Sequence, residues 1–328
     1  MIFAPKAKRD DEHKICQHKM RACWDGRFEQ DLAKKEGREL DGFSPTMRHT
    51  TFKCHNATNT LRPGYVCEQL DVESAYHKGE FPPDAPPCYA RPPRHAVNGT
   101  RFQKYDKRGV AYVWRMKVPH YGQTMARPYW FNTAIKFLTE ERKWKQSEYD
   151  PCYLWIELPD GSRLDMGLYV DDGWCTHNKS KHAIAELDAI DAKFTIKRQP
   201  GSYFLGCNVD ARPGHCHLSM RTYSEALAEK YLPKPLAEYP AYTCPSTDEL
   251  REAYKAAVER VDTLDAAGIT RYMSKCGGAI YACPAARVGE CYTIGICART
   301  LTFPTARMEA CLDRAIVCMA QHPHDGPR

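Results

Sequence analysis

Two kinds of apolar spacing divide the chain into a mixed part and a helical part. Residues 65–71, YVCEQLD, place apolar side chains at even spacing and predict a strand that ends at Asp71. Residues 152–177 predict a meander of three strands, with turns at 159–162 and at the Asp-Asp-Gly of 171–173. The first part of the chain is therefore expected to contain an antiparallel sheet.

A helical period of apolar residues predicts an amphipathic helix over 129–146 and another over 181–194, with Ser180 as its N-cap. The polar first 60 residues show no long helical pattern, and a second hairpin is predicted over 202–220. Helical patterns dominate the rest of the chain, over 221–232, 249–264, 269–282 and 305–320. The expected fold class is α+β, with a mixed core to about residue 220 and a mostly helical C-terminal third.

The composition is that of a globular protein, with 328 residues, 43% apolar and 27% charged. No stretch approaches the 18 or so apolar residues of a membrane span, and the first apolar run is too short for a signal peptide, so we expect an intracellular protein without a membrane partner. The sixteen cysteines include no Cys-x-x-Cys and are expected to be free thiols. The tight cluster His215-Cys216-His217 lacks a partner pair and favours a strand with surface histidines over a metal site.

The net charge of +6 is unevenly distributed. Residues 101–146 hold eleven Lys or Arg against three acids. Such an excess suits a polyanionic partner, because each phosphate contact releases counterions. A solvated helix face explains the charge equally well, so both interpretations stay open.

Two adjacent acids, Asp171 and Asp172, follow the apolar run of a predicted strand. Two carboxylates about 4 Å apart repel each other by roughly 4 kcal/mol at an effective dielectric constant near 20, which favours protonation of one or binding of a cation. The triplet Asp-Asp-Gly alone is also typical of an exposed turn. A second strand-terminal acid, Asp71, changes this balance, because two adjacent strands would bring all three acids to one edge, where two metal ions could support phosphoryl transfer. We expect Asp171 to be the direct ligand and Asp172 the more peripheral one.

An ordered series of blocks along nearly the whole chain extends this hypothesis. The blocks are HKMRACWDG, GFSPTMRHTTF, LDVESAYHKGEF, CYARPP, HYGQTMARPYWF, SEYDPCYLW, LYVDDG, YFLG, LSMRTYSEALAEKY, CPST and RYMSKCGGAIYA. In order and spacing they resemble the reverse transcriptase of copia-type long-terminal-repeat retrotransposons.

The resemblance implies a right-hand polymerase with fingers, palm and thumb. Residues 1–206 would form the fingers, truncated at their N-terminal end, and the palm with its mixed or antiparallel sheet. Residues 207–328 would form the primer-grip hairpin, the thumb and the start of a connection region, without an RNase H domain. Such an enzyme acts in the cytoplasm, within a virus-like particle, or in the nucleus, and its polyprotein would supply RNase H and integrase segments.

The resemblance also implies a reaction and its cofactor. Asp71, Asp171 and Asp172 would hold two Mg²⁺ ions, with Mn²⁺ as an alternative. The primer 3′-hydroxyl would attack the α-phosphate of a deoxynucleoside triphosphate on an RNA or DNA template.

Further positions match the family's substrate contacts. Lys19 and Arg21 match the finger cations that grip the triphosphate, although a solvated basic strand explains them as well. Tyr76 matches the aromatic gate that excludes a ribose 2′-hydroxyl, with a core tyrosine as the alternative. Met125 occupies the nucleotide-pocket position, and the primer grip would consist of Phe204, Leu205 and Gly206.

The chain also departs from the family pattern. Met125 stands where the family has glutamine, and Arg127-Pro128 stands where it has Pro-Arg. These changes keep a second hypothesis open, a catalytically decayed fragment that binds nucleic acid without polymerising. A cysteine-rich metal-binding or redox protein is a third, which the unpaired cysteine spacing disfavours.

Overall fold

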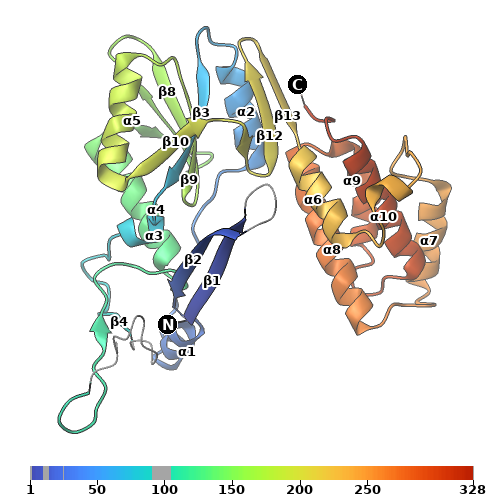
Figure 1. Cartoon of the computed structure of the whole chain (residues 1–328), viewed down its shortest axis with the longest axis horizontal. Helices are drawn as coiled ribbons and strands as arrows, with labels where there is room; N and C mark the ends of the chain where they lie inside the picture. Colours follow the sequence, from blue (N-terminus) through green and yellow to red (C-terminus); the bar gives the residue numbers. More distant parts are fainter. Residues whose placement is uncertain (1, 10–14, 25, 91–104, 328) are drawn as a thin grey trace.

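The computed structural model describes residues 2–9, 15–24, 26–90 and 105–327, except for the side chains of residues 2–9, 15–22 and 28. A six-stranded sheet lies at the centre of the first two thirds of the chain (Figure 1). Its strands have the order β10-β3-β9-β8-β7-β6, and all neighbours are antiparallel. The strands are β3 (Val66–Val72), β6 (Lys145–Gln146), β7 (Tyr153–Glu157), β8 (Arg163–Tyr169), β9 (Asp172–His177) and β10 (Ile196–Pro200). The predicted three-strand meander is confirmed.

Helices cover both faces of this sheet. Neighbouring strand residues point to opposite faces, so each face presents its own side chains for a helix to pack against. On one face, α4 (Ala126–Lys136) and α5 (Lys181–Phe194) pack together, with the rings of Trp130 and Phe194 5.1 Å apart. On the other face, Phe52 of α2 (His49–Asn59) meets the buried Trp174 edge-on at 5.4 Å. The predicted cap of α5 is confirmed, since the Ser180 side chain accepts a hydrogen bond from the amide of Ala183.

The helix predicted over 129–146 is shorter than expected. It starts at Ala126, changes into a π-helical segment (η1, Phe137–Glu141), and ends before Trp144. Lys143 adopts a left-handed conformation there, with φ 64°. The chain turns because Trp144 is buried and its indole donates to Glu186 of α5, which also pairs with Arg142.

The first 60 residues contain more structure than the sequence pattern indicated. Besides α2, they form the antiparallel pair β1 (Ile2–Arg9) and β2 (Ile15–Cys23) and the helix α1 (Gly26–Lys35). The buried face of α2 is largely polar, with His55, Asn56 and Asn59. Asn56 accepts a hydrogen bond from the Trp174 indole and donates one to the Phe52 carbonyl. No apolar period therefore marked this helix.

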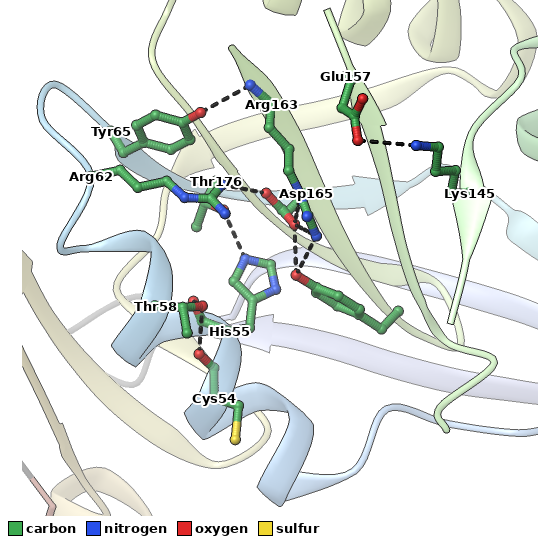
Figure 2. A network of polar contacts seen from close by, with 11 residues as sticks. Cys54, His55, Thr58, Arg62, Tyr65, Lys145, Glu157, Arg163, Asp165 and Thr176 are labelled. Carbon is green, nitrogen blue, oxygen red and sulfur yellow. Dashed lines mark hydrogen bonds and ion pairs between the residues drawn. The ribbon is translucent and has the colours of Figure 1, made fainter. Parts of the chain in front are cut away.

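A buried polar network joins α2 to the meander (Figure 2). Asp165 of β8 has no exposed surface and accepts hydrogen bonds from Arg62, Arg163 and the Tyr153 hydroxyl. Buried charges are stable only when they are paired in this way. The network therefore fixes α2 and the loop that follows it against the sheet.

Shorter elements connect these layers. After β3 comes the short helix α3 (Ala75–Lys78), and β4 (Tyr89–Ala90) and β5 (Trp114–Arg115) form a separate two-stranded sheet. The predicted second hairpin is a three-stranded sheet of β11 (Tyr203–Phe204), β12 (Cys207–Arg212) and β13 (His215–Ser219).

The C-terminal third is helical, as predicted, and Figure 1 shows its helices gathered beside β12 and β13. The elements are α6 (Arg221–Tyr231), η2 (Leu236–Glu238), α7 (Asp248–Val258), α8 (Ala266–Ala285), η3 (Val288–Glu290), α9 (Cys291–Ala298) and α10 (Ala306–Gln321). The helix α9 was not predicted. One hydrophobic core runs from Trp174 and Phe204 to Tyr272 and Ile316, so the division after residue 206 stays a prediction. Within the described residues, no helix has the length and apolar character needed to cross a membrane.

Candidate active site

Asp71 and Asp172 face each other across two neighbouring strands. Asp71 lies near the end of β3 and Asp172 at the start of β9, and the two are paired in the antiparallel register. Directly opposed residues place their side chains on the same face, with Cβ atoms about 5 Å apart. The preceding residue, Asp171, accepts a hydrogen bond from the amide of Val72 at 2.9 Å. The three acids therefore lie together at one end of the sheet, as the sequence predicted.

The tight turn that carries Asp171 is displaced from its predicted position. Tyr169 pairs with Asp172, so the turn consists of Val170 and Asp171, and Gly173 belongs to β9. Val170 has φ 60°, an unfavourable conformation for a β-branched residue. Gly173 serves packing instead, because an added Cβ would lie 3.3 Å from Leu70 Cβ. The prediction of an Asp-Asp-Gly turn was wrong by one residue.

A tryptophan from α4 holds this turn. The indole Nε1 of Trp130 donates a 2.6 Å hydrogen bond to the carbonyl oxygen of Val170. Trp130 is only 3% exposed and packs against Phe194. No pattern in the sequence predicts this contact, because it joins residues forty positions apart on different elements.

Asp172 is the acid of this group whose ionisation is made less favourable by its surroundings. Burial, followed by the charges of Asp171 and Asp71, raises the pKa of Asp172 to about 6, against a smaller opposite effect of a hydrogen bond from Gln69. At neutral pH Asp172 is largely ionised beside two like charges, a situation that a cation would relieve. Among the described side chains, no three His, Cys, Asp or Glu gather closely enough to form a ready-made metal site. The ranking of Asp171 over Asp172 as ligand stays a prediction.

Tyr76 lies beside the acids. It sits on α3, half-buried, with its ring 4.9 Å from that of Tyr121. Burial raises its pKa, with a further contribution from Asp171, while Arg127 opposes the shift. Arg127 lines a small cavity together with Trp130 and Val170, next to the turn that holds Asp171. In the sequence, Arg127 stood out only as a departure from the Pro-Arg of the family pattern. In the structure it is a cation of this site.

Met125 and Gln123 lie outside this cluster. Met125 lines a cavity of about 380 Å³ with residues of α1 and of the loop before β4. Gln123 is buried, accepts a hydrogen bond from the amide of His120 at 2.6 Å and donates one to Cys88 Sγ at 3.0 Å. The amide of Gln123 is thus committed to its own turn and does not replace the family's glutamine.

The predicted primer grip forms a tight turn between β11 and β12. Leu205 and Gly206 have φ 50° and 78°, and the Tyr281 hydroxyl donates to the Leu205 carbonyl at 3.0 Å. Phe204 is buried, 6.5 Å from the Tyr169 ring and 5.6 Å from that of Trp174. The turn therefore lies close to the acidic hairpin, and its role in binding a primer stays a prediction.

The structure says less about the predicted contacts to the triphosphate and to the template backbone. Lys19 and Arg21 lie on β2, but their side chains are outside the described residues. In the basic segment, Arg142 pairs with the largely buried Glu186, and the exposed Lys145 pairs with the exposed Glu157.

The cysteines form no paired sites among the described side chains. Fifteen of them are free, and eight of these are buried. His215, Cys216 and His217 lie along β13, where neighbouring side chains point to opposite faces. Both observations fit the interpretation of free, mostly buried thiols and a strand with flanking histidines.

The comparisons with known proteins agree with the motifs. A family model described as reverse transcriptase (RNA-dependent DNA polymerase) matches residues 3–240, which include all three acids. The structure of telomerase from Candida albicans in complex with a TWJ fragment of telomeric RNA is similar at 10% identity and a TM-score of 0.33. That alignment covers 84% of this chain and 54% of that one, so the chain spans about half of that structure's length. No curated protein matches. The copia-type resemblance is confirmed by the family match, and the chain belongs to the reverse transcriptase (RNA-dependent DNA polymerase) family.

Proposed function

We propose that this chain is the RNA-directed DNA polymerase of a copia-type retrotransposon, which adds deoxynucleotides to a primer 3′-hydroxyl. The observation that carries the proposal is the register of Asp71 opposite Asp172, with Asp171 in the adjoining turn, in a chain of this family. The polymerase reaction needs carboxylates at one point of a rigid sheet, because its geometry must be held closely during phosphoryl transfer.

The carboxylates of Asp71, Asp171 and Asp172 fit a divalent cation by their chemistry. They offer only oxygen ligands, which Mg²⁺ prefers, and burial together with the two neighbouring acids raises the pKa of Asp172. We infer that they would hold two Mg²⁺ ions, with Mn²⁺ as the alternative. The bound ions would neutralise phosphate charge and activate the primer hydroxyl.

The neighbouring residues would position the nucleotide. Tyr76, supported by Tyr121, would lie under the deoxyribose, and Arg127 offers a cation beside it. Lys19 and Arg21 would grip the triphosphate from β2. The turn at Phe204, Leu205 and Gly206 would contact the primer end.

Primer extension on an RNA template with deoxynucleotides and Mg²⁺ tests the proposal. We expect incorporation by the wild-type chain, and none by Asp171→Asn. Glu157→Gln is the matched control, because Glu157 is an exposed carboxylate on β7 that pairs with Lys145. Template binding without incorporation by the wild-type chain would contradict the proposal.

That contrary outcome would support the second hypothesis, a decayed copy that binds nucleic acid. The observation that favours it is Met125, which lines an apolar cavity where the family has glutamine. In that case Met125→Gln should restore measurable incorporation if this position caused the loss. Zinc bound to the purified chain would instead support a metal-binding protein.

A further inference from the structure

Residues 105–117, here called the basic arm, form a hairpin that extends from the body of the molecule. Its strand β5 pairs with β4, and its tip is closed by a bridge between Tyr105 and Ala111. Within the tip, the Asp106 carboxylate accepts hydrogen bonds at 2.8 Å from the amides of Arg108 and Val110. Figure 1 shows this segment reaching beyond β4 and away from the sheet. These bonds give the arm a defined shape.

The arm exposes large apolar side chains. Tyr112 is 58% exposed, Val110 61%, Val113 48% and Trp114 39%. Such a concentration of exposed apolar surface in a few residues marks an interaction site rather than a folding element. Tyr112 lies in the segment that leads into β5, and Trp114 is the first residue of that strand.

The charge of the arm identifies the kind of partner. Lys107, Arg108, Arg115 and Lys117 stand against one acid, Asp106, whose carboxylate is bound to backbone amides. The cores of protein–protein interfaces are depleted in lysine. Exposed rings close to cations instead match single-stranded nucleic acid, in which bases stack on the rings and phosphates contact the cations.

The base of the arm is fixed next to the candidate active site. The Met116 amide donates to the Cys88 carbonyl at 2.9 Å, and the Tyr121 ring packs against that of Tyr76 at 4.9 Å with a tilt of 53°. Six residues separate Arg115 from Tyr121, so they lie at most about 20 Å apart.

We propose that the basic arm binds the single-stranded RNA template just ahead of the polymerase site, with bases stacked on Tyr112 and Trp114. The assignment of the strand as template rests on the proposed function. The binding itself does not, because it needs neither catalysis nor metal.

The test is binding of a fluorescent single-stranded oligouridine RNA to the full chain, in EDTA and over a series of salt concentrations. The double variant Tyr112→Ala/Trp114→Ala should weaken binding about tenfold or more. Tyr112→Phe/Trp114→Phe keeps the rings and should retain most of the affinity. Arg115→Gln should reduce the slope of log affinity against log salt by about 0.7, the value for one phosphate contact on a single strand.

Two controls separate this inference from the proposed function. Tyr149→Ala removes a ring that is 88% exposed but lies outside the arm, and should bind RNA as the wild type does. Asp171→Asn should also bind normally, even though it cannot polymerise. Wild-type affinity in the double alanine variant, or tighter binding of oligothymidine DNA than of the RNA, would overturn the inference. RNA binding through the arm without any incorporation would instead overturn the polymerase proposal alone.

Discussion

The indole of Trp130 and the carbonyl of Val170, 2.6 Å apart, connect helix α4 to the turn that presents Asp171. Val170 holds a positive φ of 60°, which costs of order 1–3 kcal/mol for a residue other than glycine. Such a conformation persists only when its surroundings stabilise it. The buried Trp130 hydrogen bond is one such contact, so the helix that covers the sheet also maintains the position of a proposed catalytic acid.

We expect Trp130→Phe to lower the free energy of unfolding by about 1–3 kcal/mol, because it leaves the Val170 carbonyl without this donor while it keeps an aromatic ring against Phe194. The variant should also lower the rate of nucleotide incorporation. Glycine adopts a positive φ at no steric cost, so Val170→Gly should recover part of both losses in the Trp130→Phe background. Denaturant unfolding and primer extension of both single variants and the double variant measure this coupling. Strictly additive effects would refute the role of Trp130 in holding the turn.

Removing the charge of Asp172 should stabilise the fold. Its native pKa of about 6 lies above the ordinary value of 3.8, so the folded state holds the proton more tightly than the unfolded chain. The stability contributed by that proton is complete below about pH 4 and is lost as the pH rises through 6. At pH 7.5, Asp172→Asn should therefore raise the free energy of unfolding, by about 1 kcal/mol once solvent screening is allowed for.

The same substitution should reduce polymerase activity, because a neutral amide is a poorer ligand for a cation than a carboxylate. Thermal unfolding at pH 4 and at pH 7.5, together with primer extension, checks both parts. If Asp172→Asn and the wild type differed in stability by the same amount at both pH values, ionisation of Asp172 would not destabilise the fold.

The parts of this molecule that follow from local patterns were predicted well. The meander of β7, β8 and β9, helix α5 with its Ser180 cap, and most C-terminal helices follow from apolar periodicity and turn residues. The helix α2 escaped prediction because its buried face is polar, with Asn56 satisfied by Trp174 of a distant strand. The helix α9 was also missed.

In the candidate site, too, some features follow from local sequence patterns and others depend on tertiary contacts. The proximity of Asp71 to the acidic pair follows from two strand ends and from the resemblance of the blocks. The strained Val170 turn and the proximity of Arg127 to Tyr76 depend on tertiary contacts, which no spacing in the sequence reports. Turn position also eluded prediction, because Asp-Asp-Gly satisfies local turn preferences while the sheet register selects Val170 and Asp171 instead.

Tyr76 gives a prediction on sugar selectivity. Tyr76→Ala removes the ring beside Asp171 and should raise ribonucleotide use relative to deoxynucleotide use by about tenfold. Tyr76→Phe keeps the ring and its contact with Tyr121, and should preserve the selectivity. Competition between the two nucleotide types in primer extension measures the ratio. Unchanged selectivity in Tyr76→Ala would make Tyr76 a packing residue.

His55 should make the fold sensitive to acid. It is buried, and its Nε2 lies 2.9 Å from the Thr176 hydroxyl, on the α2 side of the Asp165 network (Figure 2). Burial is the main cause that lowers its pKa from 6.5 to about 4; Arg163 and Arg62 add to this, and Asp165 opposes it. The unfolded chain binds this proton more tightly, so stability is lost as the pH falls from about 6.5 towards 4, by about 3 kcal/mol.

The substitution His55→Gln keeps a side chain that can hydrogen-bond to Thr176 but removes the titrating ring. We expect this variant to be less stable at pH 7, because an amide fits the imidazole site poorly, yet to lose less stability between pH 6.5 and pH 4 than the wild type does. Denaturant unfolding across this pH range measures the two slopes. The exposed His215 on β13 provides the control, since His215→Gln should follow the wild-type profile. Parallel profiles for wild type and His55→Gln would show that the buried imidazole does not couple folding to acid.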